Sequence, residues 1–234
     1  KTIILKMSTD SKKFLKRYGP IIFIMSLFSI IVITTFYYVL QPKVSLPIYS
    51  PSMVSEELVE EDIRYIKKYH KINDFLLTNQ NGELISQEFY QNKIYIADFF
   101  FTTCPDICPI MTENMSYLQN ELKDQVDVML VSFSVTPQVD TVDVLRAYAD
   151  SRGVDDSKWN LFTGNKKDIY ELARKSFLVA KNDGDGGRYD MIHTENFVLI
   201  DKESRIRGFY DGTNKEEIKK LLIDIKILNN SYKN

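Results

Sequence analysis

The two cysteines of the chain, Cys104 and Cys108, are the residues best suited to chemistry. Two cysteines in 234 residues are too few for a disulfide-stapled scaffold, so their closeness in sequence indicates a local site. A proline follows each of them and disfavours regular helical geometry at both positions. We therefore expect a structured loop, followed by a helix from Pro109 whose positive dipole end lowers the pKa of the thiols, especially that of Cys108.

The three residues between the cysteines leave two kinds of thiol chemistry open. A disulfide requires Cβ atoms within about 4.5 Å, whereas two thiolates on one metal, with bonds of about 2.3 Å, can lie further apart. The spacing favours metal chelation without excluding a disulfide. Two thiolates leave a soft metal in need of a further ligand, and one added imidazole suits Cu(I) or also Cu(II) and Zn(II).

Only two histidines are present to supply that imidazole. His193 is the better candidate, because it follows a glycine-rich loop, residues 183–188, and stands just before a predicted strand. An ordinary hydrogen-bonded histidine at a strand end has the same sequence context, so position alone does not decide its role. His70 lies in a lysine-rich stretch and is predicted to be a solvated surface residue.

Strands and helices alternate around these candidate residues. An apolar and aromatic run over residues 94–101, broken only by Asp98, predicts a strand buried on both faces just before Cys104. The following elements are expected to be a helix at 109–123, a strand at 126–135, helices at 140–151 and 169–177, a hairpin of strands at 196–200 and 205–210, and a helix at 215–228. This order predicts an α/β thioredoxin-like fold, a mixed central sheet flanked by helices.

An uncharged segment precedes this domain. Residues 18–41 carry no charge, and the 21 residues from Pro20 to Leu40 are almost wholly apolar. At about 1.5 Å per residue they span a hydrocarbon core of about 30 Å. We predict a transmembrane anchor at 18–41 after a tail at 1–17. A cleaved signal peptide is the alternative, but the apolar run is longer than a usual signal core and no small-residue cleavage site follows it.

Charges beside this segment predict its orientation. Four basic residues lie at positions 12, 13, 16 and 17, whereas Lys43 is the only one in the 20 or so residues after the segment. The positive-inside rule places the tail in the cytoplasm and the rest of the chain outside. Prolines between residues 41 and 56 predict an extended linker over 42–59, which leaves 60–234 as the soluble domain. The lack of an Arg-rich amphipathic presequence favours the periplasmic side of a bacterial inner membrane over a mitochondrial one.

The balance of charge argues against one class of partner. With 30 basic and 32 acidic residues, the formal net charge is only -2, so the chain offers no general attraction to phosphate backbones. Nucleic acid is therefore not expected as a partner.

Motifs spread over the chain resemble the Sco/SenC family of copper-binding respiratory assembly proteins. The run from Phe99 to Pro109 carries the resemblance, and further matches follow in the family's order: Ser134-Val135-Thr136-Pro137 with Asp140-Thr141, the stretch 159–164, Tyr189, and His193-Thr194. The resemblance implies a thioredoxin-like domain outside the cytoplasm that binds one copper through Cys104, Cys108 and His193. It also implies help in building the binuclear copper centre of cytochrome c oxidase, with the copper-accepting subunit of that enzyme and thiol reductants or other copper carriers as partners.

Two positions depart from the family pattern. Thr136 stands where the family usually has Asp, and Ile192 stands where Asp often precedes the histidine. We expect both to lie outside the direct metal ligands and to affect partner docking more than metal binding. Asp106, between the cysteines, is expected to be a helix-start carboxylate that positions the loop.

Two functions remain in competition. The first is a membrane-anchored metallochaperone, not an enzyme, which passes copper to a client by ligand exchange. The second is a thiol-disulfide oxidoreductase that reduces client cysteines with Cys104 and Cys108 as nucleophile and resolver. His193 is dispensable for the second function and necessary for the first. A peroxidase is not favoured, because no arginine adjoins the cysteine loop.

Overall fold

The computed structural model describes residues 9–40, 45–59, 64–65, 70–180 and 191–233. The chain divides into two compact units, one ending at Val44 and the other beginning at Ser45. The predicted glycine-rich loop and Tyr189 lie outside the described residues.

The first unit contains one long helix, α1, Thr9–Leu40. Its stretch Lys16–Leu40 has a mean hydropathy of 2.2 and is long and apolar enough to cross a membrane, and protein covers none of it. The hydroxyls of Ser26, Thr34 and Thr35 each donate to the carbonyl four residues earlier, at 2.6–2.8 Å. Their polar groups are thereby satisfied inside the helix, as an apolar surrounding requires. This helix agrees with the predicted anchor.

The second unit is built on a mixed sheet whose strand order is β2-β1-β5-β4-β3-β6-β7. The central strands β3, β4 and β5 are parallel, and the remaining neighbours pair antiparallel. The strand bounds are β1 Leu76–Asn79, β2 Leu84–Ser86, β3 Ile94–Phe100, β4 Val128–Ser134, β5 Trp159–Thr163, β6 Asn196–Ile200 and β7 Ile206–Asp211. The predicted α/β architecture is confirmed, and the hairpin β1–β2 and strand β5 are added to it.

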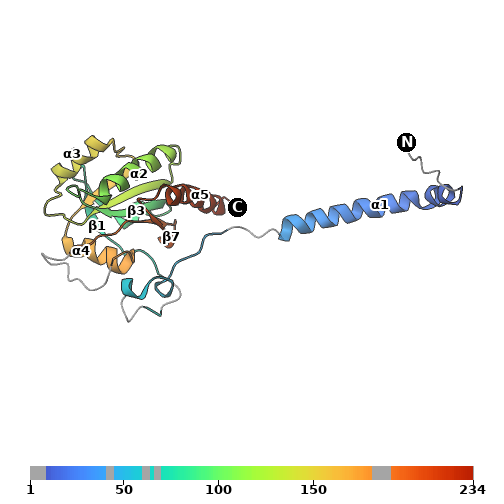
Figure 1. Ribbon diagram of the computed structural model, residues 1–234, viewed down its shortest axis with the longest axis horizontal. Helices are drawn as coiled ribbons and strands as arrows, with labels where there is room; N and C mark the ends of the chain where they lie inside the picture. Colours follow the sequence, from blue (N-terminus) through green and yellow to red (C-terminus); the bar gives the residue numbers. More distant parts are fainter. Residues whose placement is uncertain (1–8, 41–44, 60–63, 66–69, 181–190, 234) are drawn as a thin grey trace. The chain divides into compact units, whose positions relative to one another are not determined.

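Helices cover both faces of this sheet (Figure 1). The described helices are α2 Ile107–Glu121, α3 Val142–Arg152, α4 Lys166–Glu171, a π-helical turn Leu172–Ser176 and α5 Lys215–Ser231, with short 3-10 turns at Pro51–Met53, Glu56–Leu58 and Gln87–Tyr90. Apolar residues of α2, α3 and α5 share one core cluster, and those of α4 and the π-helical turn share the other. Strand β3 lies between the two clusters, because its successive side chains point to opposite faces.

The ends of these helices have clear chemical causes. Thr141 caps α3 by accepting a hydrogen bond from the Val144 N–H, and Asn214 caps α5 by accepting one from Glu216. Gly153 ends α3 with φ 66°, a left-handed conformation that glycine adopts without strain.

The expected linker is described from residue 45 onward, where it is part of the second unit and contacts strand β7. The Tyr49 N–H donates to the Ile206 carbonyl of β7 at 2.9 Å. The guanidinium of Arg207 donates to the carbonyls of Leu46 and Pro47 at 2.6 and 2.8 Å. Residues 45–59 are thus held against the domain, because β7 is a sheet edge and Arg207 supplies donors beside it.

Candidate metal centre

The two cysteines lie where strand β3 gives way to helix α2. Both are free thiols, and both are buried, Cys104 at 9% exposure and Cys108 at 4%. Their sulfurs hydrogen-bond to each other, and the backbone N–H groups of Asp106, Ile107 and Cys108 point at Cys104. The loop therefore brings two soft ligands into contact at the start of a helix.

The start of the helix differs from the prediction. Helix α2 begins at Ile107 rather than at Pro109, so Cys108 is inside its first turn. Pro109 fits there because the N–H groups of a first turn have no partner within the helix. Asp106 is at the cap position, but its side chain makes no capping hydrogen bond. Asp106 thus stands at the start of the helix as expected, and its role in positioning the loop stays a prediction.

The two thiols differ in acidity, in the opposite order to the prediction. Burial opposes ionisation of Cys104, but hydrogen bonds from the Cys108 thiol and from backbone N–H groups lower its pKa on balance. Burial raises the pKa of Cys108, and its role as donor to Cys104 raises it further. The prediction that Cys108 is the more acidified thiol is wrong, because this sulfur lies inside the core rather than at the open helix end.

A buried carboxylate, Asp140, holds the loop before the cysteines. It accepts hydrogen bonds from the N–H and hydroxyl of Thr102, at 3.2 and 2.5 Å, and from the hydroxyls of Ser134 and Thr136, at 2.6 and 3.0 Å. Thr136, the first departure from the family pattern, is thus part of the scaffold behind the loop. Sequence reasoning noted Asp140 only as a motif match and missed this role.

His193 is exposed and stands on the segment that leads into β6. Its ring meets the ring of Phe101 nearly edge-on, at 5.9 Å between centroids and 85° between planes. The Phe101 carbonyl in turn accepts the N–H of Cys104 at 3.2 Å. His193 therefore reaches the cysteine loop through one aromatic residue that sequence reasoning did not single out. Its neighbour Ile192, the second departure, is buried at 4% exposure.

The three candidate ligands lie on neighbouring segments, but their side chains are not arranged around one point. Within the described ranges, no group of three His, Cys, Asp or Glu side chains is arranged to hold a metal ion. His193 instead lines a cleft of about 340 Å³ together with Met191 and Arg174. The donor set of two thiols in contact and a neighbouring imidazole nevertheless fits a soft metal such as copper.

His70 does not have the solvated position that its lysine-rich context suggests. It is half-buried, and its Nε2 hydrogen-bonds to the carbonyl of Ser176 at 2.7 Å. Burial lowers the pKa of its imidazole. The surface prediction is therefore wrong, since this histidine joins the segment before β1 to the end of the π-helical turn.

A second buried carboxylate, Asp98, lies in strand β3 near the thiols. The Ser132 hydroxyl donates to it, and the Trp159 indole donates to that hydroxyl at 2.9 Å. Burial raises the pKa of Asp98 to about 7, although the Ser132 hydrogen bond lowers it. Its charge is one of the influences that raise the pKa of Cys108.

Comparison with known proteins connects this geometry to a family. Residues 64–227 match the model of the SCO1/SenC family. The SCO1 protein homolog of Bacillus subtilis (strain 168) is 32% identical over 161 residues, which cover 67% of this chain and 82% of that protein.

Solved structures show the same likeness. BsSco, described with a disulfide switch and as a member of the Sco family of cytochrome c oxidase assembly proteins, is 31% identical with a TM-score of 0.59, over 68% of this chain and 93% of that one. Bradyrhizobium japonicum ScoI with copper bound is 27% identical with a TM-score of 0.53, over 66% of this chain and 99% of that one. The fold, the thiol pair beside a histidine and the match over residues 64–227 together place this chain in the SCO1/SenC family.

Proposed function

We propose that this chain is a membrane-anchored copper chaperone that binds one copper through Cys104, Cys108 and His193 and serves the assembly of cytochrome c oxidase. The observation that carries the proposal is the contact between the two thiols, with His193 one aromatic ring away. Relatives with copper bound and with a place in oxidase assembly support it.

The difference in pKa between the two thiols suggests the order in which the ligands bind copper. Cys104 is the thiol whose lowered pKa favours the thiolate, so it is the first ligand to meet copper. Cys108 keeps its proton until the metal displaces it, so copper uptake releases protons. His193 then turns from the edge of Phe101 toward the two sulfurs to complete the ligand set. A ligand that joins last is also the one that a client can displace first.

Copper stoichiometry of the full chain in detergent tests this proposal. We expect one copper per chain with reduced thiols, and loss or strong weakening of binding in each of Cys104→Ser, Cys108→Ser and His193→Ala. The oxidised form should show thiolate-to-copper charge transfer. His70→Ala is the matched control, because this histidine contacts Ser176 instead. Absence of copper uptake by the parent, or uptake indifferent to His193, contradicts the proposal.

Thiol exchange is the second candidate, and the difference between the thiols favours it. An acidified Cys104 in contact with a protonated Cys108 matches an attacking thiolate and a resolving thiol. The disulfide switch of BsSco adds support. Rapid reduction of client disulfides by the His193→Ala variant would establish this function, since the histidine takes no part in it.

A further inference from the structure

Two consecutive hydrogen bonds connect helix α2 with the segment that carries His193. The Asn114 side chain on α2 is 6% exposed, and its Nδ2 donates to the carbonyl of Gly212 at 2.7 Å. The N–H of Gly212 donates to the carbonyl of Glu195, also at 2.7 Å. Glu195 stands two residues after His193, and Cys108 stands in the first turn of α2. The connection therefore joins the two parts of the candidate metal centre.

Gly212 is the point at which this connection requires a glycine. A Cβ atom there would lie 2.9 Å from the Glu195 carbonyl oxygen and 2.5 Å from the ring of Phe197. Any side chain would push the start of β6 away from the turn after β7. The absent side chain lets the backbone approach closely enough for both hydrogen bonds.

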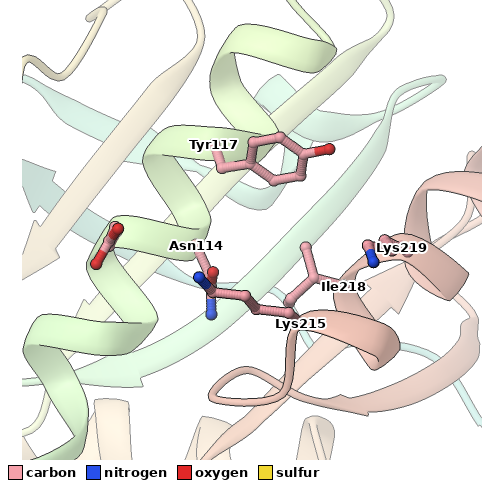
Figure 2. Close-up of a pocket in the computed structure, with 6 residues that line it drawn as sticks. Asn114, Tyr117, Lys215, Ile218 and Lys219 are labelled. Atoms are coloured by element: carbon pink, nitrogen blue, oxygen red, sulfur yellow. The ribbon is translucent and has the colours of Figure 1, made fainter.

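Asn114 lies at the edge of the core that α2 shares with α5. A pocket of about 300 Å³ lies beside it, between α2 and α5. Figure 2 shows Asn114 and Tyr117 projecting from α2 toward Lys215, Ile218 and Lys219 of α5. The apolar side chains of α2 pack against β6, β7 and α5 in the shared core, and the hydrogen bond of Asn114 adds the polar contact between α2 and the turn at Gly212.

We propose that Asn114 is a positioning residue of the copper site, which acts through Gly212 and Glu195 on His193. The segment from Met191 to Glu195 directly precedes β6. The hydrogen bond from Gly212 therefore fixes Glu195, the last residue of this segment before the strand begins. Loss of the Asn114 amide leaves the Gly212 carbonyl unpaired and lets the start of β6 shift relative to the cysteines. This inference rests on the proposed copper function.

Copper affinity of the full chain in detergent, with reduced thiols, tests the proposal. Asn114→Leu keeps the size of the side chain and removes the donor. We expect it to weaken copper binding about tenfold or more, as supporting residues of metal ligands do, and to diminish the histidine-nitrogen signal in the electron paramagnetic resonance spectrum of the Cu(II) form. Asn114→Gln, which keeps an amide donor, should restore part of both.

Gln119→Leu is the matched control. Gln119 is also a buried amide of α2, and it donates to the carbonyl of Gly153 at 2.9 Å, on the side of α3 and away from His193. Its loss should disturb the packing of α2 comparably and leave copper affinity unchanged. Equal weakening by Gln119→Leu and Asn114→Leu would overturn the proposal, since general loosening of α2 then explains both.

A double-mutant cycle separates this inference from the proposed function. If Asn114 acts through His193, Asn114→Leu has no further effect on affinity in the His193→Ala background. An unchanged affinity of Asn114→Leu, while His193→Ala weakens binding, overturns the role of Asn114 alone. A parent chain that takes up no copper, or binds it regardless of His193, overturns both. Should Asn114→Leu not fold, Asn114→Ser, whose hydroxyl is too short to reach Gly212, takes its place with the same expectations.

Discussion

At the scale of single residues, the hydrogen bond between the two thiols shifts their pKa values in opposite directions. Cys108 donates to Cys104, which lowers the pKa of the acceptor and raises that of the donor. Burial is the largest influence on the pKa of each thiol, and the contact with the other thiol comes next. Oxidation or metal binding at one sulfur therefore changes the chemistry of both.

This difference in pKa predicts the order of alkylation in the reduced, metal-free chain. At neutral pH iodoacetamide should modify Cys104 first, because only the thiolate reacts and the lowered pKa of Cys104 provides it. Cys108→Ala removes the donated hydrogen bond, so it should slow alkylation of Cys104 by about two- to tenfold, the equivalent of one hydrogen bond of roughly 0.5–1.5 kcal/mol. Mass spectrometry of peptides over time measures both rates.

The control is Cys108→Ser, whose hydroxyl can still donate to Cys104. It should alkylate at close to the parent rate. Equal slowing by the Ala and Ser substitutions would show that the donor at position 108 does not set the reactivity of Cys104.

The identity of these residues was predictable from the sequence, but their environment was not. Spacing and context indicated the two cysteines, and the family resemblance added His193; their binding of copper stays a prediction. The order of the pKa shifts was not predictable, because it depends on which sulfur lies inside the core and which accepts the hydrogen bond. Phe101 was missed for a similar reason, since its contact with His193 joins the loop after β3 to the segment before β6, which are far apart in the sequence.

At the scale of elements, strand β3 is unusual because it is fully buried and yet contains an ionisable side chain, that of Asp98. Asp98 is 2% exposed and has a pKa raised to about 7 by burial. An unfolded Asp ionises near pH 4. The folded state therefore binds the proton of Asp98 more tightly than the unfolded state does. This difference stabilises the fold fully below about pH 4, and the stabilisation is lost as the pH rises through about 7.

The expected effect is a pH-dependent free energy of unfolding that disappears in Asp98→Asn. Between pH 5 and pH 8 the metal-free, reduced parent should lose roughly 2–3 kcal/mol of stability from this group. The variant, which cannot ionise, should lose much less. Urea unfolding of residues 45–234 at the two pH values measures the difference.

Asp143→Asn, an exposed carboxylate of α3, is the control and should keep the pH dependence of the parent. Equal changes in stability of the parent and of Asp98→Asn between pH 5 and pH 8 would show that Asp98 does not titrate in this range.

Most elements with largely apolar sequences were predictable, whereas the short strand β5 was not. The strands at β3, β4, β6 and β7 were located to within two residues. Strand β5 was missed, because Asn160 makes its sequence look like a loop. In the fold, Asn160 donates to the Tyr90 hydroxyl at 2.8 Å and accepts from Asn79 at 3.2 Å. Such a polar residue is compatible with a buried strand only once its distant partners are in place.

At the scale of the whole molecule, the apolar helix suits a bilayer and the α/β domain suits water. The stretch Lys16–Leu40 suits a bilayer, and the domain has its own two-layered core. Separate units of this kind allow the domain to fold independently of the membrane. We predict that the charges around the helix decide on which side of the membrane the domain lies.

Orientation is testable with reporters in a bacterial host. Alkaline phosphatase, which is active only outside the cytoplasm, should be active when fused after residue 234. Green fluorescent protein fused at the same place should be dark if the fusion is exported. Neutralising Lys12, Lys13, Lys16 and Arg17 together should lower phosphatase activity, because these bases set the orientation. The reverse reporter pattern in the parent fusion would contradict the proposed location.

The contact of residues 46–49 with β7 has a consequence for chains that share a membrane. Strand β7 ends the sheet, and an open sheet end is a template on which a strand of another molecule can add. Chains confined to two dimensions collide far more often than chains in solution. Through Tyr49 and the carbonyls held by Arg207, the chain covers part of this end with its own backbone, and we expect this cover to oppose the addition of a strand from another copy.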